Sequence, residues 1–316
     1  MTGKPINNMV ASVRAQLLNL ARSNGKPYNE ILIQYALERF LFRLSKSPFK
    51  SRFLLKGGLL LMGRGLPQAR PTRDIDLLGL TEKDLNVVFP MIRAVGERIF
   101  PDGLVYDFSK MTHETLTPES DHSGLRFKFQ GRLGKAIVPM QIDIGFGDSV
   151  VPNPTEIVFP TLLDMEPPVV MGYAPETVIA EKFEAALDLA DLNSRMKDYY
   201  DIWFLARTCS FEGRILQDAI VSTCNRRRTE IQSDAVMFRN DFGARADKNI
   251  QWLAFLGKGA IKAAPEFFPM VIKDIQIFLR PVAAACQEKR AFEAKWSAGG
   301  PWKPIKKAHL ADKGNV

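Results

Sequence analysis

Residues 56–76 read KGGLLLMGRGLPQARPTRDID, and this stretch decides the fold that we expect. The apolar residues 53–55 lead into Lys56 and the pair Gly57 and Gly58, and four apolar residues follow, so the order predicts a strand, a glycine turn and a helix. Paired glycines let backbone N–H groups approach an anion, and a helix start behind them adds partial positive charge. The stretch therefore indicates a cradle for a triphosphate.

The end of the same stretch predicts a short strand that begins at Asp74. Carboxylates two residues apart on a strand project from the same face, so Asp74 and Asp76 are placed to share one or two divalent cations. Two such ions, about 4 Å apart, stabilise the attacking and leaving oxygens of an in-line phosphoryl displacement. Alone, a glycine pair often only marks a turn, and a strand-end carboxylate pair is often a solvated edge. Together, in this order, they favour nucleotidyl transfer.

A third carboxylate lies on the strand that we expect over residues 136–146. Ile142 and Ile144 share one face of that strand, which places Asp143 on the opposite face. Beside the Asp74–Asp76 strand, this carboxylate would supply the third metal ligand and the base for the acceptor hydroxyl. The alternative is an aspartate that caps a turn, which is the interpretation that we favour for Asp148.

A second group of charged residues lies further along the chain. Helical spacing places Lys182 on or beside an apolar stripe, unlike Glu181 or Glu184, and an inward-facing lysine needs an anion such as a triphosphate or an aspartate. Asp198 and Asp201 adjoin the apolar stripe of the next helix, which begins near Arg195. One hypothesis is an ionic network that locks two helices together; the other is a functional site.

These motifs, in this order, resemble a known family. KGG with TRDIDLLGL resembles the AbiEii/AbiGii-type nucleotidyltransferase toxins of bacterial toxin–antitoxin and phage-defence loci, within the polymerase-beta-like nucleotidyltransferase superfamily. QIDIGFGD, AEKFEA and RMKDYYDI are similar to the later motifs of these proteins. The resemblance extends over approximately residues 10–285.

The resemblance implies a mechanism. Asp74, Asp76 and Asp143 would hold two Mg²⁺ ions, or Mn²⁺, while Lys182 would bind the triphosphate of an NTP and a downstream aspartate would orient it. The spacing leaves open whether that aspartate is Asp198 or Asp201. Some toxins of this family modify tRNA 3′ ends and so block translation, which makes the 3′ end of tRNA or another RNA the expected acceptor and implies a cognate antitoxin encoded nearby. The candidates for nucleotide binding are Lys56, Gly57, Gly58, Arg73, Lys182 and Arg195.

Composition narrows the partners further. A formal net charge of +8 favours a polyanion, above all nucleic acid, and residues 226–228 are three arginines that form either a solvated face or a platform for RNA. No apolar run is long enough to cross a bilayer, and we see no secretory signal, so we expect a cytoplasmic protein without a membrane partner. Two other hypotheses stay open: nucleotidyl transfer to a protein or small-molecule hydroxyl, and a non-catalytic nucleic-acid-binding protein.

We expect an α/β fold: a mixed nucleotidyltransferase-type sheet with flanking helices, followed by an all-helical C-terminal lobe. The division that we expect comprises N-terminal helices packed on the core (1–50), the nucleotidyltransferase core (51–150), a proline-rich extended linker (151–175), the helical lobe (176–290) and a basic, disordered tail (291–316). Within it we expect helices over residues 8–23, 29–45 and 81–99, and strands over residues 104–117, 122–130 and 136–146.

Overall fold

The computed structural model describes residues 4–65, 70–116 and 124–305. The chain divides into two compact units, Met1–Ala174 and Pro175–Val316.

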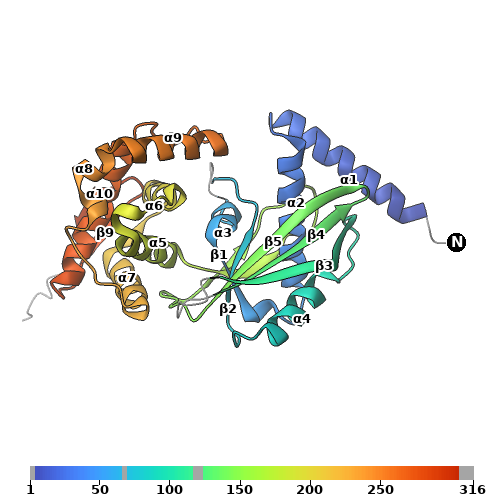
Figure 1. Cartoon of the computed structure of the whole chain (residues 1–316), viewed down its shortest axis with the longest axis horizontal. Coiled ribbons are helices and arrows are strands. Elements are labelled where there is room, and N and C mark those ends of the chain that lie inside the picture. The colour runs from blue at the N-terminus through green and yellow to red at the C-terminus, as the bar shows by residue number, and fades with distance from the viewer. Residues whose placement is uncertain (1–3, 66–69, 117–123, 306–316) are drawn as a thin grey trace, which may run out of the picture. The chain divides into compact units, whose positions relative to one another are not determined.

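The first unit is built around a mixed sheet (Figure 1). Its strands are β1 (Phe53–Lys56), β2 (Ile75–Gly79), β3 (Leu104–Leu116), β4 (Gly124–Leu133), β5 (Ala136–Phe146), β6 (Thr155–Val158) and β7 (Val169–Gly172). In the part of the chain that the structure describes, seven strands are hydrogen-bonded in the order β3-β4-β5-β2-β1-β7-β6. The pairs β2–β5 and β1–β7 are parallel, and the remaining pairs are antiparallel. The mixed sheet that we expected is confirmed.

Helices cover the face of this sheet that carries the buried phenylalanine side chains of β4. The helices of the first unit are α1 (Lys4–Ser23), α2 (Tyr28–Ser45), the short 3-10 turn η1 (Lys50–Arg52), α3 (Gly57–Gly63) and α4 (Leu85–Gly96). Along β4, Phe127 and Phe129 are buried, whereas Lys128 between them is exposed. Phe40 of α2 contacts Phe129, and Phe89 of α4 contacts Phe127, so these two helices pack on the phenylalanine face.

The helix that we expected to begin at Thr81 begins later. The side chain of Asp84 accepts a hydrogen bond from the backbone N–H of Asn86, so Asp84 is the N-cap of α4. Pro90 lies inside α4 without ending it. Threonine and aspartate are both good N-cap residues, so the sequence alone did not distinguish a helix that starts at Thr81 from one that starts after Asp84.

The proline-rich residues 151–175 are not simply an extended linker, so that expectation was wrong in part. They contain β6 and β7, which pair with each other, and β7 pairs with β1 in the main sheet. Pro152 and Pro154 precede β6, and Pro160, Pro167 and Pro168 lie between the two strands. Because the prolines lie outside the strands, they interrupt no ladder hydrogen bond.

Two charged residues of α2 tie the loop between β6 and β7 to the helix. A Glu38 carboxylate oxygen accepts a hydrogen bond from the backbone N–H of Leu162 at 2.8 Å, and Arg39 Nη2 donates to the carbonyl oxygen of Glu166 at 2.9 Å. Arg39 Nε lies 3.0 Å from the other Glu38 oxygen. Burial raises the pKa of Glu38 to about 7.

The second unit is mostly helical. Its helices are α5 (Pro175–Leu189), α6 (Met196–Thr208), α7 (Gly213–Arg227), α8 (Asn240–Ala244), α9 (Ala246–Gly259) and α10 (Phe268–Gln287), with 3-10 turns η2 (Ala190–Leu192) and η3 (Val236–Phe238). Helix α10 contacts α6, α7 and α9, and Tyr200, Trp252 and Phe268 form part of the aromatic core between them. The helical C-terminal part that we expected is therefore confirmed.

A small sheet closes this unit and corrects the expected disordered tail. Strands β8 (Phe211–Glu212), β9 (Ala294–Trp296) and β10 (Trp302–Pro304) pair in the order β10-β9-β8. The indole of Trp302 stacks on Phe278 at 5.8 Å between ring centroids, and its N–H donates to the carbonyl oxygen of Phe278 at 2.7 Å. Aromatic burial orders the chain up to residue 305, whereas residues 306–316 lie outside the described residues. None of the described helices is both long and apolar enough to span a membrane.

Candidate active site

The turn between β1 and α3 requires glycine. Lys56 pairs with Asp76 across the antiparallel β1–β2 ladder, so the chain turns directly beside this carboxylate. Gly57 has φ +68°, and a Cβ atom there would lie 1.9 Å from Asp76 Oδ2. At Gly58 a Cβ atom would lie 2.9 Å from Arg70 Nη1. Both glycines therefore serve close approach, and the first also needs a backbone conformation that L-residues rarely adopt.

Three carboxylates gather beside this turn. Asp76 and Asp143 are register partners on the parallel strands β2 and β5, and Asp74 immediately precedes β2. One ligand oxygen from each of the three lies within 4.8 Å of the other two, and all three residues are half-buried. The Thr72 hydroxyl donates to Asp74 Oδ1. Hard carboxylate oxygens in this arrangement fit a divalent cation such as Mg²⁺, so the cluster matches the metal ligands expected from the sequence.

Arginine and lysine side chains neutralise two carboxylates near this turn. Arg126 on β4 makes a bidentate pair with Asp143, with Nε and Nη2 each 2.7 Å from a carboxylate oxygen. This hydrogen bonding raises the pKa of Arg126 above its usual range. Lys56 Nζ lies 2.8 Å from Asp148 Oδ2, in a largely buried pair, and 5.3 Å from the centre of the Tyr173 ring. Asp148 thus forms an ion pair, a role that the turn-capping interpretation did not foresee.

Lys182 forms a buried ionic group in the second unit. Its ammonium nitrogen lies 2.7 Å from Asp198 Oδ1 and 2.8 Å from Asp201 Oδ2, and these carboxylates are 2% and 0% exposed. Arg195 Nε lies 2.7 Å from the other Asp198 oxygen. Burial alone would raise the pKa of Asp198, but the charges of Lys182 and Arg195 outweigh it, so the pKa lies below its usual range. The structure therefore brings together all four residues of this group.

The expectation for one neighbouring charge, Glu184, fails. Glu184, which we placed away from the apolar stripe of its helix, is only 4% exposed. Its carboxylate accepts hydrogen bonds from Arg227 Nη1 at 2.7 Å and from the Thr229 hydroxyl at 2.6 Å. Lys248 on α9 is also buried, and it donates to two backbone carbonyl oxygens in the segment between α5 and α6. Arg227 and Lys248 therefore belong to the internal structure, because both are held by partners distant in sequence.

The candidate phosphate-binding residues differ in their exposure and in their partners. Arg73 is exposed, and Lys56 is engaged with Asp148. Arg126 was not among the sequence candidates, although its position on an alternating strand places it on the polar face. The missing information was the register Arg126↔Asp143 between β4 and β5, which no local pattern gives.

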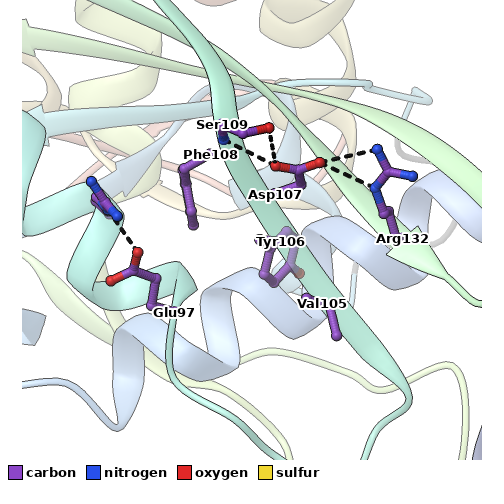
Figure 2. Close-up of a pocket in the computed structure, with 8 residues that line it drawn as sticks. Glu97, Val105, Tyr106, Asp107, Phe108, Ser109 and Arg132 are labelled. Carbon is purple, nitrogen blue, oxygen red and sulfur yellow. Dashed lines mark hydrogen bonds and ion pairs between the residues drawn. The ribbon is translucent and has the colours of Figure 1, made fainter.

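A separate cavity of about 600 Å³ lies against β3. Figure 2 shows Asp107 in its lining, accepting hydrogen bonds from Ser109 and from Arg132. The lining consists of Arg93, Glu97, Val105, Tyr106, Asp107, Phe108, Ser109 and Arg132. Among the described residues, this lining includes none of the acidic cluster or of the glycine turn.

A glycine turn packed against an acidic cluster on neighbouring strands of a mixed sheet fits a metal-dependent phosphoryl-transfer enzyme such as a nucleotidyltransferase. The comparison with protein families gives the particular group. The chain belongs to the family described as "Nucleotidyl transferase AbiEii toxin, Type IV TA system", whose profile matches residues 39–279. The family resemblance expected from the motifs is confirmed. Membership of this family implies a toxin with an NTP substrate and an antitoxin partner.

Two solved structures are similar to the chain. JHP933 from Helicobacter pylori is 14% identical, with a TM-score of 0.46, over 79% of this chain and 90% of that one. An H. pylori protein provisionally described as a nucleotidyltransferase is also 14% identical, with a TM-score of 0.48, over 83% of this chain and 98% of that one. No curated protein matches the chain.

Proposed function

We propose that this toxin transfers NMP from an NTP to the 3′ hydroxyl of tRNA or another RNA, and so blocks translation. The observation that carries the proposal is the cluster of Asp74, Asp76 and Asp143, with Asp76 packed against Gly57. The net charge of +8 supports an RNA acceptor. We further propose that the protein acts in the cytoplasm, where tRNA and a cognate antitoxin would be present.

The metal chemistry follows from the three carboxylates. Asp74, Asp76 and Asp143 would hold two Mg²⁺ ions, which when bound stabilise charge on the attacking and leaving oxygens. Asp143 would also accept the proton of the acceptor hydroxyl, so that the oxygen attacks the α-phosphorus and pyrophosphate leaves. The absence of side chains at Gly57 and Gly58 lets Asp76 and Arg70 pack directly against the backbone at the start of α3, and we propose that a phosphate group binds beside this turn.

We propose that Lys182 binds the triphosphate. Its ammonium group is held by Asp198 and Asp201, so its position is set before any nucleotide arrives. Both aspartates contact the lysine, and both are therefore candidates for orienting it. Arg73, which is exposed, and Arg195, whose side chain is 49% exposed, are proposed as further phosphate contacts.

The test is transfer of label from each α-³²P-labelled NTP, with Mg²⁺, to total RNA. Label in tRNA-sized RNA would support the proposal and identify the base. Label in protein alone would instead show transfer to a protein hydroxyl. Binding of NTP and RNA without any transfer, by a folded protein supplied with Mg²⁺ and Mn²⁺ in turn, would favour a non-catalytic nucleic-acid-binding protein.

A further inference from the structure

Arg126 holds the third carboxylate of the acidic cluster with both of its oxygens in use. Arg126 Nε donates to Asp143 Oδ1 and Nη2 donates to Asp143 Oδ2, each at 2.7 Å. The same carboxylate supplies one of the three mutually close oxygens of the cluster. A cation bound there would use an Asp143 oxygen whose lone pairs the guanidinium already shares, and it would lie beside a fixed positive charge, so the two cations oppose each other at this carboxylate.

A second partner for the guanidinium is already in place. Glu114 Oε1 on β3 lies 3.3 Å from Arg126 Nη1, and it also accepts from Lys128 Nζ at 3.0 Å. The register Glu114↔Arg126↔Asp143 places the three residues side by side across β3, β4 and β5. Arg126 already donates to Glu114 and is 29% exposed, so Glu114 can keep the guanidinium when Asp143 releases it.

We propose that Arg126 takes the place of a cation at Asp143 when no metal is bound. Metal binding then breaks at least one of the two hydrogen bonds from Arg126 to Asp143 and shifts the guanidinium toward Glu114. The inference rests on the proposed function, because it assumes that the acidic cluster binds metal. Three carboxylates so close together repel one another, and the guanidinium relieves that repulsion until metal arrives. Arg126 therefore competes with the metal and lowers the metal affinity of the site.

The test is direct binding of Mn²⁺ to the full chain, measured by calorimetry and by the loss of the free Mn²⁺ EPR signal. Arg126→Gln removes the competing cation, so we expect Mn²⁺ to bind about tenfold more tightly, the effect of a unit charge close to a divalent ion once water and salt screen it. Arg126→Lys keeps the charge and should stay within about threefold of the unsubstituted protein. If Arg126 only orients Asp143, Arg126→Gln binds Mn²⁺ more weakly, which overturns the inference.

Arg132 offers a matched control on the same strand and face. It also pairs with an aspartate, Asp107, although its Nε and Nη2 both donate to the single oxygen Oδ2, at 3.2 and 3.0 Å (Figure 2). Arg132→Gln removes an equal charge away from the cluster, so Mn²⁺ affinity should change by less than about twofold. An equal gain in both variants would show a general charge effect and overturn the inference.

Melting curves provide a second measurement that does not depend on activity. Without Arg126 the repulsion between carboxylates is unrelieved, so Arg126→Gln should melt at a lower temperature in EDTA. Its melting temperature should rise more than that of the unsubstituted protein when Mn²⁺ is added.

If Arg126→Gln does not fold, Glu114→Gln replaces it. Loss of the second partner strengthens the Arg126–Asp143 pair, so this variant should bind Mn²⁺ two- to threefold more weakly, and unchanged or tighter binding overturns the inference. Binding of Mn²⁺ by the unsubstituted protein with no gain in Arg126→Gln overturns this inference only, whereas no Mn²⁺ binding by any variant overturns the proposed metal site as well.

Discussion

Substitution of Gly57 by alanine tests whether the glycine turn sets the position of Asp76. At φ +68° an L-residue costs about 1–2 kcal/mol of stability. The new Cβ atom would lie 1.9 Å from Asp76 Oδ2, and Cβ contacts are essentially never under 3.0 Å, so the carboxylate must move by more than 1 Å. Misplacing a catalytic group by about 1 Å can cost 10²-fold in rate, which corresponds to roughly 2.7 kcal/mol of transition-state stabilisation.

Gly25 provides a control with the same backbone conformation. It has φ +61°, but a Cβ atom there would have nothing within 4 Å. Gly25→Ala should therefore lose about 1–2 kcal/mol of stability with unchanged transfer activity. The assay is the initial rate of label transfer from NTP to RNA, together with urea unfolding of both variants.

The comparison separates geometry from stability. If Gly57→Ala transfers label as fast as Gly25→Ala at a temperature where both are folded, the contact between Gly57 and Asp76 does not control the site and the reasoning is refuted. If Gly57→Ala loses about 100-fold in rate while Gly25→Ala loses none, the turn positions the carboxylate.

Three further predictions concern charge. Lys182→Met leaves the carboxylates of Asp198 and Asp201 buried without their shared cation and should lower the unfolding free energy, measured in urea, by about 3 kcal/mol. Lys197 is exposed, and an equal loss of unfolding free energy in Lys197→Met would contradict this explanation. The pKa of Glu38 is about 7 in the folded protein, against an ordinary 4.5. Between these two pH values the folded state keeps a proton on Glu38 that the unfolded state has lost, so the protein loses roughly 3 kcal/mol of stability as the pH rises from 4.5 to 7. Glu38→Gln should remove that loss, and equal unfolding free energies of variant and unsubstituted protein at pH 8 would argue against it. EDTA should abolish transfer and added Mg²⁺ or Mn²⁺ should restore it, and activity that persists in EDTA would exclude a metal role for the acidic cluster.

The sequence predicts the parts of the site that lie close together along the chain. The glycine turn, the Asp74–Asp76 pair and the helix that bears Lys182 each depend on a spacing of two to four residues, which fixes the face of a strand or helix. Asp143 was predictable for the same reason, because isoleucines on either side determine its face. Local spacing and the family motifs together give the acidic cluster.

Partners across the sheet could not be predicted in this way. Arg126 reaches Asp143 through the register of β4 and β5, and Lys56 reaches Asp148 from a strand that ends 92 residues earlier. A one-residue slip of either strand would leave the sequence pattern of that strand unchanged while removing such a pair. The prolines around β6 and β7, like the lysines near Trp302, suggested irregular structure because composition does not reveal a strand that forms only against a distant partner.

The central claim is that the three carboxylates carry out nucleotidyl transfer, and one measurement tests it most directly. We would compare the unsubstituted protein with Asp74→Asn, Asp76→Asn in label transfer from each α-³²P-labelled NTP to RNA, after circular dichroism has shown that both are folded. The account predicts labelled RNA with the unsubstituted protein alone. Equal labelling by the double variant, or no labelling of any acceptor by the folded, Mg²⁺-loaded protein, would contradict it.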